Sequence, residues 1–339
     1  MRVLVIKTSS LGDVVHTLPA LTDASQALGD INFDWVVEES FAEIPAWHPA
    51  VDRVIPVALR RWRKHPIKAW TSGEWRRFKS EVRLHEYDKI IDAQGLLKSA
   101  WLTRKADGRR CGLAKTSARE PMAARFYHEH HDIARGQHAV DRVRQLFAAC
   151  LGYRVPDTPP DYGLDKTRLG RPTDMNNYVV FLHGTTWASK HWPEAYWLQL
   201  ASDMSKYNVK IVLPWGNDEE RQRAQRIADS CDAAHVPDRT SLSDMAAILN
   251  GARAVVAVDT GLAHLAAALS VPTIGLYGAT QPGLTGTRGA KQTHLGVTWH
   301  CAPCLQRQCS DNTQAGVTPP CYSTLTPDRV CRELDKVLA

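Results

Sequence analysis

The chain has 339 residues, a length at which one hydrophobic core rarely suffices, so we expect two domains. Its composition, 44% apolar and 23% charged residues, is typical of a soluble globular protein and excludes fibrous and low-complexity classes. No apolar run is long enough to cross a bilayer, and the start MRVLVIKTSS lacks a signal-peptide core, so a cytosolic chain is expected. In that compartment the eight cysteines favour metal or redox chemistry over a disulfide framework.

Short apolar segments alternate with helical patterns along the chain. In the first half we expect strands at 2–6, 33–37, 53–57 and 89–93 and helices at 13–28, 66–84, 95–105 and 138–151. The Pro-, Asp- and Gly-rich segment 155–177 is typical of a linker. The alternation then resumes, with strands at 178–183, 209–214, 253–258 and 272–277 and helices at 193–206, 218–230, 242–250 and 260–269. This pattern predicts an α/β fold of two doubly wound parallel sheets, joined near residue 165.

Ligands of such sheets bind at the carboxyl ends of the strands. At this end of the first strand the sequence continues into the loop KTSSLGD. This loop has neither the GxGxxG spacing of a dinucleotide site nor the order of a Walker A loop. It offers small residues, among them Ser10 and Gly12, followed by Asp13 at the start of a helix. Asp13 can cap that helix, or it can act as a general base toward a sugar hydroxyl, and the residues alone leave both readings open.

Three loops of the second half carry further polar groups at strand ends. They are Gly184, Thr185, Thr186 and Lys190 after the first strand, Glu220 after the second, and Asp259, Thr260, Gly261 and His264 after the third. Amides, hydroxyls and a lysine can hold a diphosphate and neutralise it as it departs. Taken singly, Glu220 can be a solvated helix carboxylate and His264 a satisfied buried histidine.

The positive charge of the chain is concentrated in one segment. Residues 60–79 hold eight basic residues and one acid, a net charge of +7, whereas the whole chain carries +6. The remainder therefore sums to −1, and the segment predicts an anionic partner. The alternative is a solvated basic face on an amphipathic helix over residues 66–79.

Four cysteines near the C-terminus have the spacing C-x2-C-x4-C-x11-C. They are Cys301, Cys304, Cys309 and Cys321. Four thiolates at this spacing can close a tetrahedral site for structural zinc or iron, or they can remain free or redox-active thiols. His128, His130 and His131 are expected in a polar turn, and no acids stand at ligand spacing beside them, so no metal site is predicted there.

Several segments occur together in a known order: KTSSLGDVVHTLPAL, FDWVVEESF, RRWRK, IIDAQGLLKSA, FLHGTTWASKHWP, LPWGNDEE and VDTGLAHLAAAL. This set resembles the lipopolysaccharide heptosyltransferases, most closely the type I enzymes of the inner core, over nearly the whole chain. The resemblance implies a GT-B fold, with two Rossmann-like domains facing a central cleft. It places an acceptor-binding domain at 1–165, a nucleotide-sugar-binding domain at 166–325, and a terminal helix at 326–339 that crosses back to the N-terminal domain.

The same resemblance implies a metal-independent glycosyltransferase that moves L-glycero-D-manno-heptose from ADP-heptose to the Kdo of Kdo2-lipid A with inversion. Asp13 resembles the catalytic base and Lys190 the lysine on the donor phosphates. The other implied donor contacts are Ser10, Gly12, Thr185, Thr186, Glu220, Asp259, Thr260, Gly261 and His264. The implied acceptor contacts are Arg60, Arg61, Arg63, Lys64 and Arg119.

No cofactor is expected for catalysis. We expect the enzyme to lie peripherally on the cytosolic face of the inner membrane, with Trp62, Trp70, Trp75 and Phe78 against the lipid interface. A heptosyltransferase of the same fold with another acceptor, such as a second heptose, remains an alternative. A non-catalytic binder of anionic lipid or nucleic acid is a further one, although no RNA-binding fingerprint is present and nucleic acid is not expected as a partner.

Overall fold

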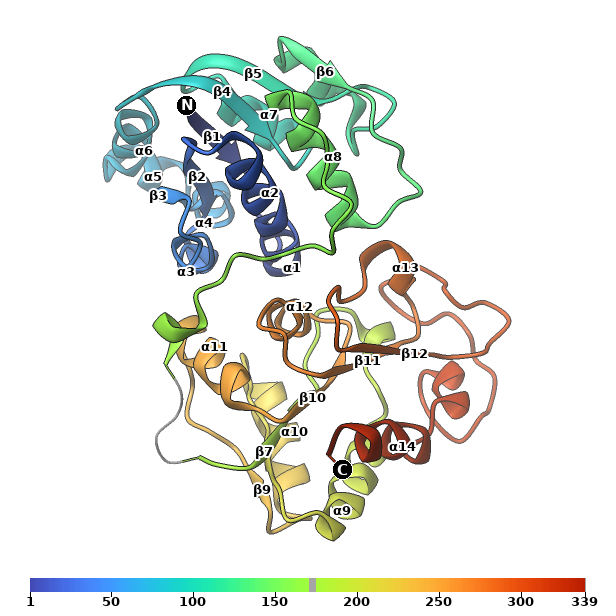
Figure 1. Ribbon diagram of the computed structural model, residues 1–339. Coiled ribbons are helices and arrows are strands. Elements are labelled where there is room, and N and C mark those ends of the chain that lie inside the picture. The colour runs from blue at the N-terminus through green and yellow to red at the C-terminus, as the bar shows by residue number, and fades with distance from the viewer. Residues whose placement is uncertain (171–174, 339) are drawn as a thin grey trace. The chain divides into compact units, whose positions relative to one another are not determined.

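The computed structural model describes residues 1–170 and 175–338. The chain divides into two compact units, Met1–Asp165 and Lys166–Ala339, at the position where the sequence analysis divides it. Each unit contains one parallel six-stranded sheet with helices around it (Figure 1). The predicted α/β class with two doubly wound parallel sheets is therefore confirmed. Among the described residues, no helix has both the length and the apolar character needed to cross a membrane.

The sheet of the first unit has the strand order β3-β2-β1-β4-β5-β6. The strands are β1 (Arg2–Ile6), β2 (Asn32–Glu38), β3 (Val51–Val57), β4 (Glu86–Asp92), β5 (Asp107–Leu113) and β6 (Glu129–His131). In β1, Val5 pairs with Trp35 of β2 on one side and with Ile91 of β4 on the other. The strand order reverses between β1 and β4, which is where doubly wound sheets bind ligands.

Helices cover both faces of this sheet. They are α1 (Leu11–Val15), α2 (Leu18–Leu28), η1 (Glu39–Phe41), α3 (Glu43–Ala46), α4 (Leu59–Lys64), α5 (Pro66–Thr71), α6 (Glu74–Val82), α7 (Leu97–Thr103), η2 (Pro121–Phe126) and α8 (Ala139–Leu151). On one face, Leu4 packs in a buried cluster with Phe78 of α6. On the other, Phe33 contacts Phe147 of α8, with ring centroids 6.3 Å apart. Alternate residues of the central strands therefore enter separate cores, which explains why these strands are apolar throughout.

Two of the expected helices in this unit are each interrupted once. The stretch 13–28 forms α1 and α2, and Pro19 lies in the first turn of α2, where its missing N–H costs nothing. The stretch 66–84 forms α5 and α6, separated at Gly73, whose φ of +75° is a left-handed conformation that favours glycine. The single helix predicted for each stretch is therefore wrong.

The second sheet repeats the winding of the first, with the order β12-β11-β10-β7-β8-β9. Its strands are β7 (Tyr178–Leu182), β8 (Lys210–Val212), β9 (Ala234–His235), β10 (Ala254–Val258), β11 (Thr273–Tyr277) and β12 (Gln292–Gly296). The strand order reverses between β7 and β10, which pair directly, Phe181 opposite Val256. The loops after these two strands therefore flank the expected ligand position of this unit.

The helices of the second unit are η3 (Lys166–Leu169), η4 (Ala188–Lys190), α9 (Glu194–Asp203), η5 (Met204–Lys206), α10 (Asp218–Ala228), α11 (Leu242–Gly251), α12 (Gly261–Ala268), α13 (Pro282–Thr285), η6 (Pro320–Thr324) and α14 (Pro327–Leu338). In α14, Val330 and Leu334 are fully buried in a core cluster together with Leu200 of α9. The apolar side of the terminal helix thus packs on the second unit, and the expected crossing of this helix to the first unit stays a prediction. The helix α14 packs against α9 and against strands β10 and β11.

Four strands are missing from the sequence prediction: β5, β6, β9 and β12. Their sequences, DGRRCGL, EHH, AH and QTHLG, are polar or very short. Strands at or near a sheet edge bury less of their surface, so they need fewer apolar residues and carry a weaker sequence signal. The polar turn expected around His130 and His131 is therefore wrong, because residues 129–131 pair with β5.

Candidate active site

At the reversal point of the first sheet, the loops after β1 and β4 are joined by hydrogen bonds. The Nζ of Lys7 donates to the carbonyl of Ala93 at 3.0 Å. The backbone N–H and the hydroxyl of Thr8 both donate to Oε1 of Gln94 at 2.8 Å. These contacts hold the start of the KTSSLGD loop against the end of β4, so the loop has a defined place at the strand ends.

Asp13 lies in the first turn of α1, beside this loop. Its Oδ2 accepts hydrogen bonds from the backbone N–H and the hydroxyl of Ser10, at 2.8 and 2.9 Å. Its Oδ1 lies 3.9 Å from the Nζ of Lys7, and 47% of the side chain is exposed. The capping interpretation of Asp13 is thus confirmed, and the same carboxylate faces solvent next to a cation. Gly12 is buried in the same turn.

No role is predicted from the sequence for the residues after β4, although their segment IIDAQGLLKSA is one of those that carry the family resemblance. Asp92 is fully buried and accepts hydrogen bonds from Tyr127 and Ser99 at 2.7 and 2.8 Å. Burial is the main cause that raises the pKa of Asp92. Gln94 and the exposed Lys98 both reach the hydroxyl of Ser9, at 3.3 and 3.5 Å. The sequence did contain a signal for these residues. Gln94 and Lys98 follow a buried strand, and ligand contacts in such sheets lie at strand ends.

In the second unit, Lys190 and Asp259 meet at the reversal point of the sheet. The Nζ of Lys190 lies 2.7 Å from Oδ2 of Asp259, and the two side chains are only 16% and 8% exposed. Thr280, which the sequence analysis missed, donates to the same oxygen at 2.6 Å. The hydroxyl of Thr185 donates to the carbonyl of Asp259 at 3.0 Å. The loops after β7, β10 and β11 therefore converge on one carboxylate.

Several other residues predicted for the donor site lie around this pair. Nε2 of the buried His264 lies 3.8 Å from Oδ1 of Asp259. Thr260 is the N-cap of α12 and Gly261 is its first residue, so the amides of that helix start lie beside Asp259. Thr186 is exposed, and the Nζ of Lys190 lies 4.4 Å from the ring centroid of Trp187. Helix amides, hydroxyls and a lysine in one place are suited to binding phosphate.

Glu220 lies in the first turn of α10 with its carboxylate close to the loop after β7. Its Oε2 accepts the N–H of Gly216 at 2.8 Å, and Asn217 caps the helix through the Glu220 N–H at 2.9 Å. A Cβ added at Gly184 would lie 2.5 Å from the Glu220 carboxyl carbon and 2.6 Å from Oε1. Gly184 therefore leaves the space that the carboxylate occupies.

Four of the five predicted acceptor cations lie on α4, and their surroundings differ. Arg61 forms ion pairs with Glu39 and Glu74, each at 2.9 Å, and hydrogen bonds to the two acids raise its pKa. Arg60 has its guanidinium carbon 5.5 Å from the Phe41 ring centroid. Arg63, Lys64 and, after β5, Arg119 are exposed. The side chain of Glu120 caps α7 by accepting the N–H of Leu97 at 2.6 Å.

The aromatic residues of the basic segment are mostly packed. Phe78 is buried, and Trp62 and Trp75 pack against the same core cluster. Trp70, in contrast, is 76% exposed, and its neighbour Ile67 is 77% exposed. The expectation of a membrane contact is therefore wrong for Phe78, whose side chain is buried, while Trp62 and Trp75 are partly buried and Trp70 is the most exposed of the four.

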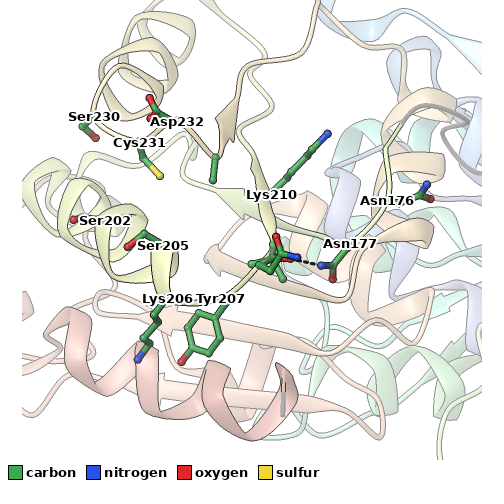
Figure 2. A pocket seen from close by; sticks show the side chains of 13 residues that line it. Asn176, Asn177, Ser202, Ser205, Lys206, Tyr207, Lys210, Ser230, Cys231 and Asp232 are labelled. Atoms are coloured by element: carbon green, nitrogen blue, oxygen red, sulfur yellow. Dashed lines mark hydrogen bonds between the residues drawn. The ribbon is translucent and has the colours of Figure 1, made fainter.

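A pocket of about 720 Å³ opens at the other edge of the second sheet (Figure 2). It is lined by Asn177, just before β7, by Lys210, at the start of β8, and by Cys231 and Asp232 ahead of β9. Asn177 donates a hydrogen bond to the carbonyl of Asn208 across it. This edge holds the amino ends of the strands, where parallel sheets do not normally bind substrates, so we assign the pocket no part in the site.

The four clustered cysteines line a small cavity at the carboxyl end of β11, together with Gly278 and Ala279. Burial, followed by the negative charges of Cys309, Cys301 and Cys304, raises the pKa of Cys321 to about 11. The group of candidate metal ligands that the described residues form here is a different one, His300, Cys301 and Asp311, with one ligand atom of each within 4.8 Å of the other two. All eight cysteines lie among the described residues and are free thiols.

Comparison with known proteins assigns the family. Residues 75–314 match glycosyltransferase family 9 (heptosyltransferase). Over its full length the chain is 55% identical to lipopolysaccharide heptosyltransferase 1 of Pseudomonas aeruginosa and covers 98% of that protein. The chain belongs to glycosyltransferase family 9.

Other members of family 9 extend this result. Lipopolysaccharide heptosyltransferase 1 of Escherichia coli K12 is 52% identical over 86% of this chain and 92% of its own length. The solved structure of E. coli heptosyltransferase WaaC with ADP matches with a TM-score of 0.89 and 46% identity, over 99% of both chains. WaaC with ADP-2-deoxy-2-fluoro heptose gives 0.86 and 45%, again over 99% of both chains. The predictions of a GT-B class fold and of a glycosyltransferase of the heptosyltransferase family are confirmed.

Proposed function

We propose that this family 9 enzyme transfers L-glycero-D-manno-heptose from ADP-heptose to the Kdo of Kdo2-lipid A, with inversion, in the lipopolysaccharide inner core. The observation that carries the proposal is the match over 99% of both chains to a heptosyltransferase solved with ADP-2-deoxy-2-fluoro heptose. At 45% identity, the likeness is one of sequence as well as of fold.

The donor diphosphate binds at the reversal point of the second sheet in this proposal. Lys190 contributes the positive charge, and Thr185, Thr186 and the start of α12 at Thr260 and Gly261 contribute hydrogen-bond donors. Asp259 orients the lysine through their contact at 2.7 Å, and His264 lies beside that carboxylate. Glu220 accepts the ribose hydroxyls. Because Lys190 neutralises ADP as it leaves, the reaction runs without a catalytic metal.

Asp13 is the proposed general base of the reaction. It takes the proton from a Kdo hydroxyl while that oxygen bonds to the anomeric carbon of heptose and the bond from this carbon to the ADP oxygen breaks. Ser10 holds one carboxylate oxygen of Asp13, and Gly12 leaves space for the sugar. The partial exposure of the Asp13 carboxylate supports this role, since a base must reach the substrate.

The test is a transfer assay with ADP-heptose and purified Kdo2-lipid A, in which released ADP and the mass of the lipid product are measured. We expect one heptose added per acceptor and no release of ADP without the acceptor. Transfer only to an acceptor that already carries heptose would mean that the acceptor sugar is a heptose and not Kdo. Tight, salt-sensitive binding to polyanions without ADP release would contradict the proposed transferase activity.

A Gly184→Ala substitution tests the ribose contact. The added methyl group would overlap the Glu220 carboxylate, so we expect the Kd for ADP to rise about tenfold or more, the effect of losing a hydrogen bond to a charged group. Isothermal titration calorimetry measures this change. Gly216→Ala is the matched control, because its Cβ would lie at an ordinary 3.4 Å from the same carboxylate. Equal effects of the two substitutions would contradict the role of Glu220.

The exposed cations Arg60, Arg63, Lys64 and Arg119 are proposed to bind the carboxylates and phosphates of the acceptor, with Arg61 held by Glu39 and Glu74 as a structural support of α4. Replacing Arg63 and Lys64 by Gln should raise the KM for Kdo2-lipid A about tenfold or more, since charge-assisted hydrogen bonds to anions are lost. Arg154→Gln, an equally exposed change of charge in the same unit, is the control. An unchanged acceptor KM, or an equal change in the Kd for ADP, would contradict the assignment.

We also propose that α5 lies on the cytosolic face of the inner membrane, because exposed Ile67 and Trp70 stand among basic residues. The same kinetic assay separates this contact from acceptor binding. A Trp70→Ala variant should raise the acceptor KM when the acceptor is presented in anionic vesicles and leave it unchanged in detergent solution. The same rise in both media would contradict the membrane contact.

A further inference from the structure

The charge balance of the proposed donor site leaves little positive charge free for a diphosphate. The Nζ of Lys190 lies 2.7 Å from Oδ2 of Asp259, so the cation of this site is already paired with a buried carboxylate. The start of α12 adds only the partial charge of a helix N-terminus, about half an elementary charge. A nucleotide diphosphate carries more than one negative charge and gains another as it leaves the sugar. A site that binds it therefore needs a further cation.

Arg307 lies near Lys190, although the two residues are far apart in the sequence. The guanidinium carbon of Arg307 lies 5.8 Å from the ring centroid of Trp187, and the Nζ of Lys190 lies 4.4 Å from the centroid of the same side chain. The two charges are thus no farther apart than these two distances together, about 10 Å. One diphosphate can contact both groups, because a charge-assisted hydrogen bond on each side of the anion spans a further ~2.8 Å.

The segment that carries Arg307 is fastened to the turn that carries Lys190. The carbonyl of Arg307 accepts a hydrogen bond from the Ser189 N–H at 3.2 Å, and the carbonyl of Gln306 accepts one from the Ser189 hydroxyl. Ser189 is buried and directly precedes Lys190. These bonds hold the backbone of the two cations side by side, so binding of an anion between their side chains needs little further ordering.

The guanidinium of Arg307 is not used by another acidic group. Its side chain is exposed, and within residues 1–170 and 175–338 it forms no ion pair with a carboxylate. Arg223, which also reaches the loop after β7, differs in this respect. It donates to the carbonyl of His183 at 3.3 Å, and its Nε lies 3.9 Å from Glu194. The uncompensated charge is therefore on Arg307, and its planar fork matches the oxygens of a phosphate.

We propose that Arg307 is a second cation of the donor site and binds the diphosphate of ADP-heptose together with Lys190. This assignment rests on the proposed function, in which the Lys190 turn binds that diphosphate. Arg307 supplies positive charge that Asp259 does not offset. No bond to Arg307 forms or breaks in the reaction, so its role is to bind the donor and the departing ADP.

Isothermal titration calorimetry with ADP tests the assignment. Arg307→Met removes the charge and keeps an unbranched side chain beside Trp187, so we expect the Kd for ADP to rise about tenfold or more. Arg307→Lys keeps a charge without the fork and should recover part of this loss. Arg332→Met, at an exposed residue of α14 in the same unit, is the matched control and should leave the Kd unchanged. An unchanged Kd for ADP in Arg307→Met would overturn the proposal.

The same titrations with adenosine separate charge recognition from packing of the loop. Adenosine has no phosphate, so its Kd should be the same for wild type and Arg307→Met. An equal rise of the Kd for adenosine and for ADP would mean that Arg307 only supports the loop, and would overturn the proposal. Wild-type protein that binds ADP but transfers no heptose would contradict the proposed function alone, because the ADP titrations decide the role of Arg307 independently of turnover.

Discussion

Asp13→Asn should lower kcat for heptosyl transfer by about 10²- to 10⁴-fold, the usual contribution of a general base. The amide cannot accept the proton of the Kdo hydroxyl at neutral pH. Its carbonyl oxygen can still accept the two hydrogen bonds from Ser10, so the first turn of α1 is preserved. Steady-state ADP release at saturating donor and acceptor measures the loss, and the Kd for ADP should stay within about twofold of wild type, since in the proposal Asp13 does not contact the nucleotide.

The chain contains a matched control for this substitution. Ser241 and Asp244 open α11 with the same Ser-Leu-X-Asp pattern, and Asp244 Oδ2 accepts the N–H and hydroxyl of Ser241 at 3.2 and 2.7 Å. Asp244→Asn therefore makes the same chemical change in the same capping motif. We expect a similar small shift in Tm for both variants and a large loss of kcat only for Asp13→Asn. Equal kcat values in the two variants would show that Asp13 is a cap and no base.

Lys190→Gln should lower kcat/KM for ADP-heptose by about 10²- to 10³-fold, because the charge that develops on the departing diphosphate is no longer neutralised. The substitution also leaves the buried Asp259 carboxylate without its cation. Breaking such a pair costs on the order of 3 kcal/mol of folding stability. Loss of activity by Lys190→Gln alone therefore cannot separate catalysis from stability.

The double variant Lys190→Gln, Asp259→Asn separates these effects. Replacing both members of the pair leaves no unpaired charge, so we expect Tm to recover toward the wild-type value while activity stays low. Lys190→Arg keeps the charge and should retain part of the donor affinity. Thermal unfolding and ADP titration on the same preparations provide the two readouts. Recovery of both Tm and turnover in the double variant would mean that Lys190 serves only to pair with Asp259.

The corrected expectations share a physical cause. DGRRCGL (β5) and QTHLG (β12) become strands because a neighbouring strand pairs with them, although their own residues lack an apolar period. Phe78 was expected at a membrane because basic residues surround it in the sequence, yet its side chain is buried in a core cluster with residues of the sheet, such as Leu4. In both cases the partner is distant in the sequence, and no local pattern specifies it.

The amino-acid sequence by itself determined the two doubly wound sheets and the position of Asp13, Lys190, Glu220 and Asp259 at strand ends. Strands buried on both faces, and the loops that interrupt them, are local properties that alternating apolar runs reveal. Only the tertiary structure decided that Lys190 pairs with Asp259, that Gly184 makes room for Glu220, and that Arg61 is already held by two acids. Such contacts depend on strand register and loop packing, which bring together side chains that are far apart along the chain.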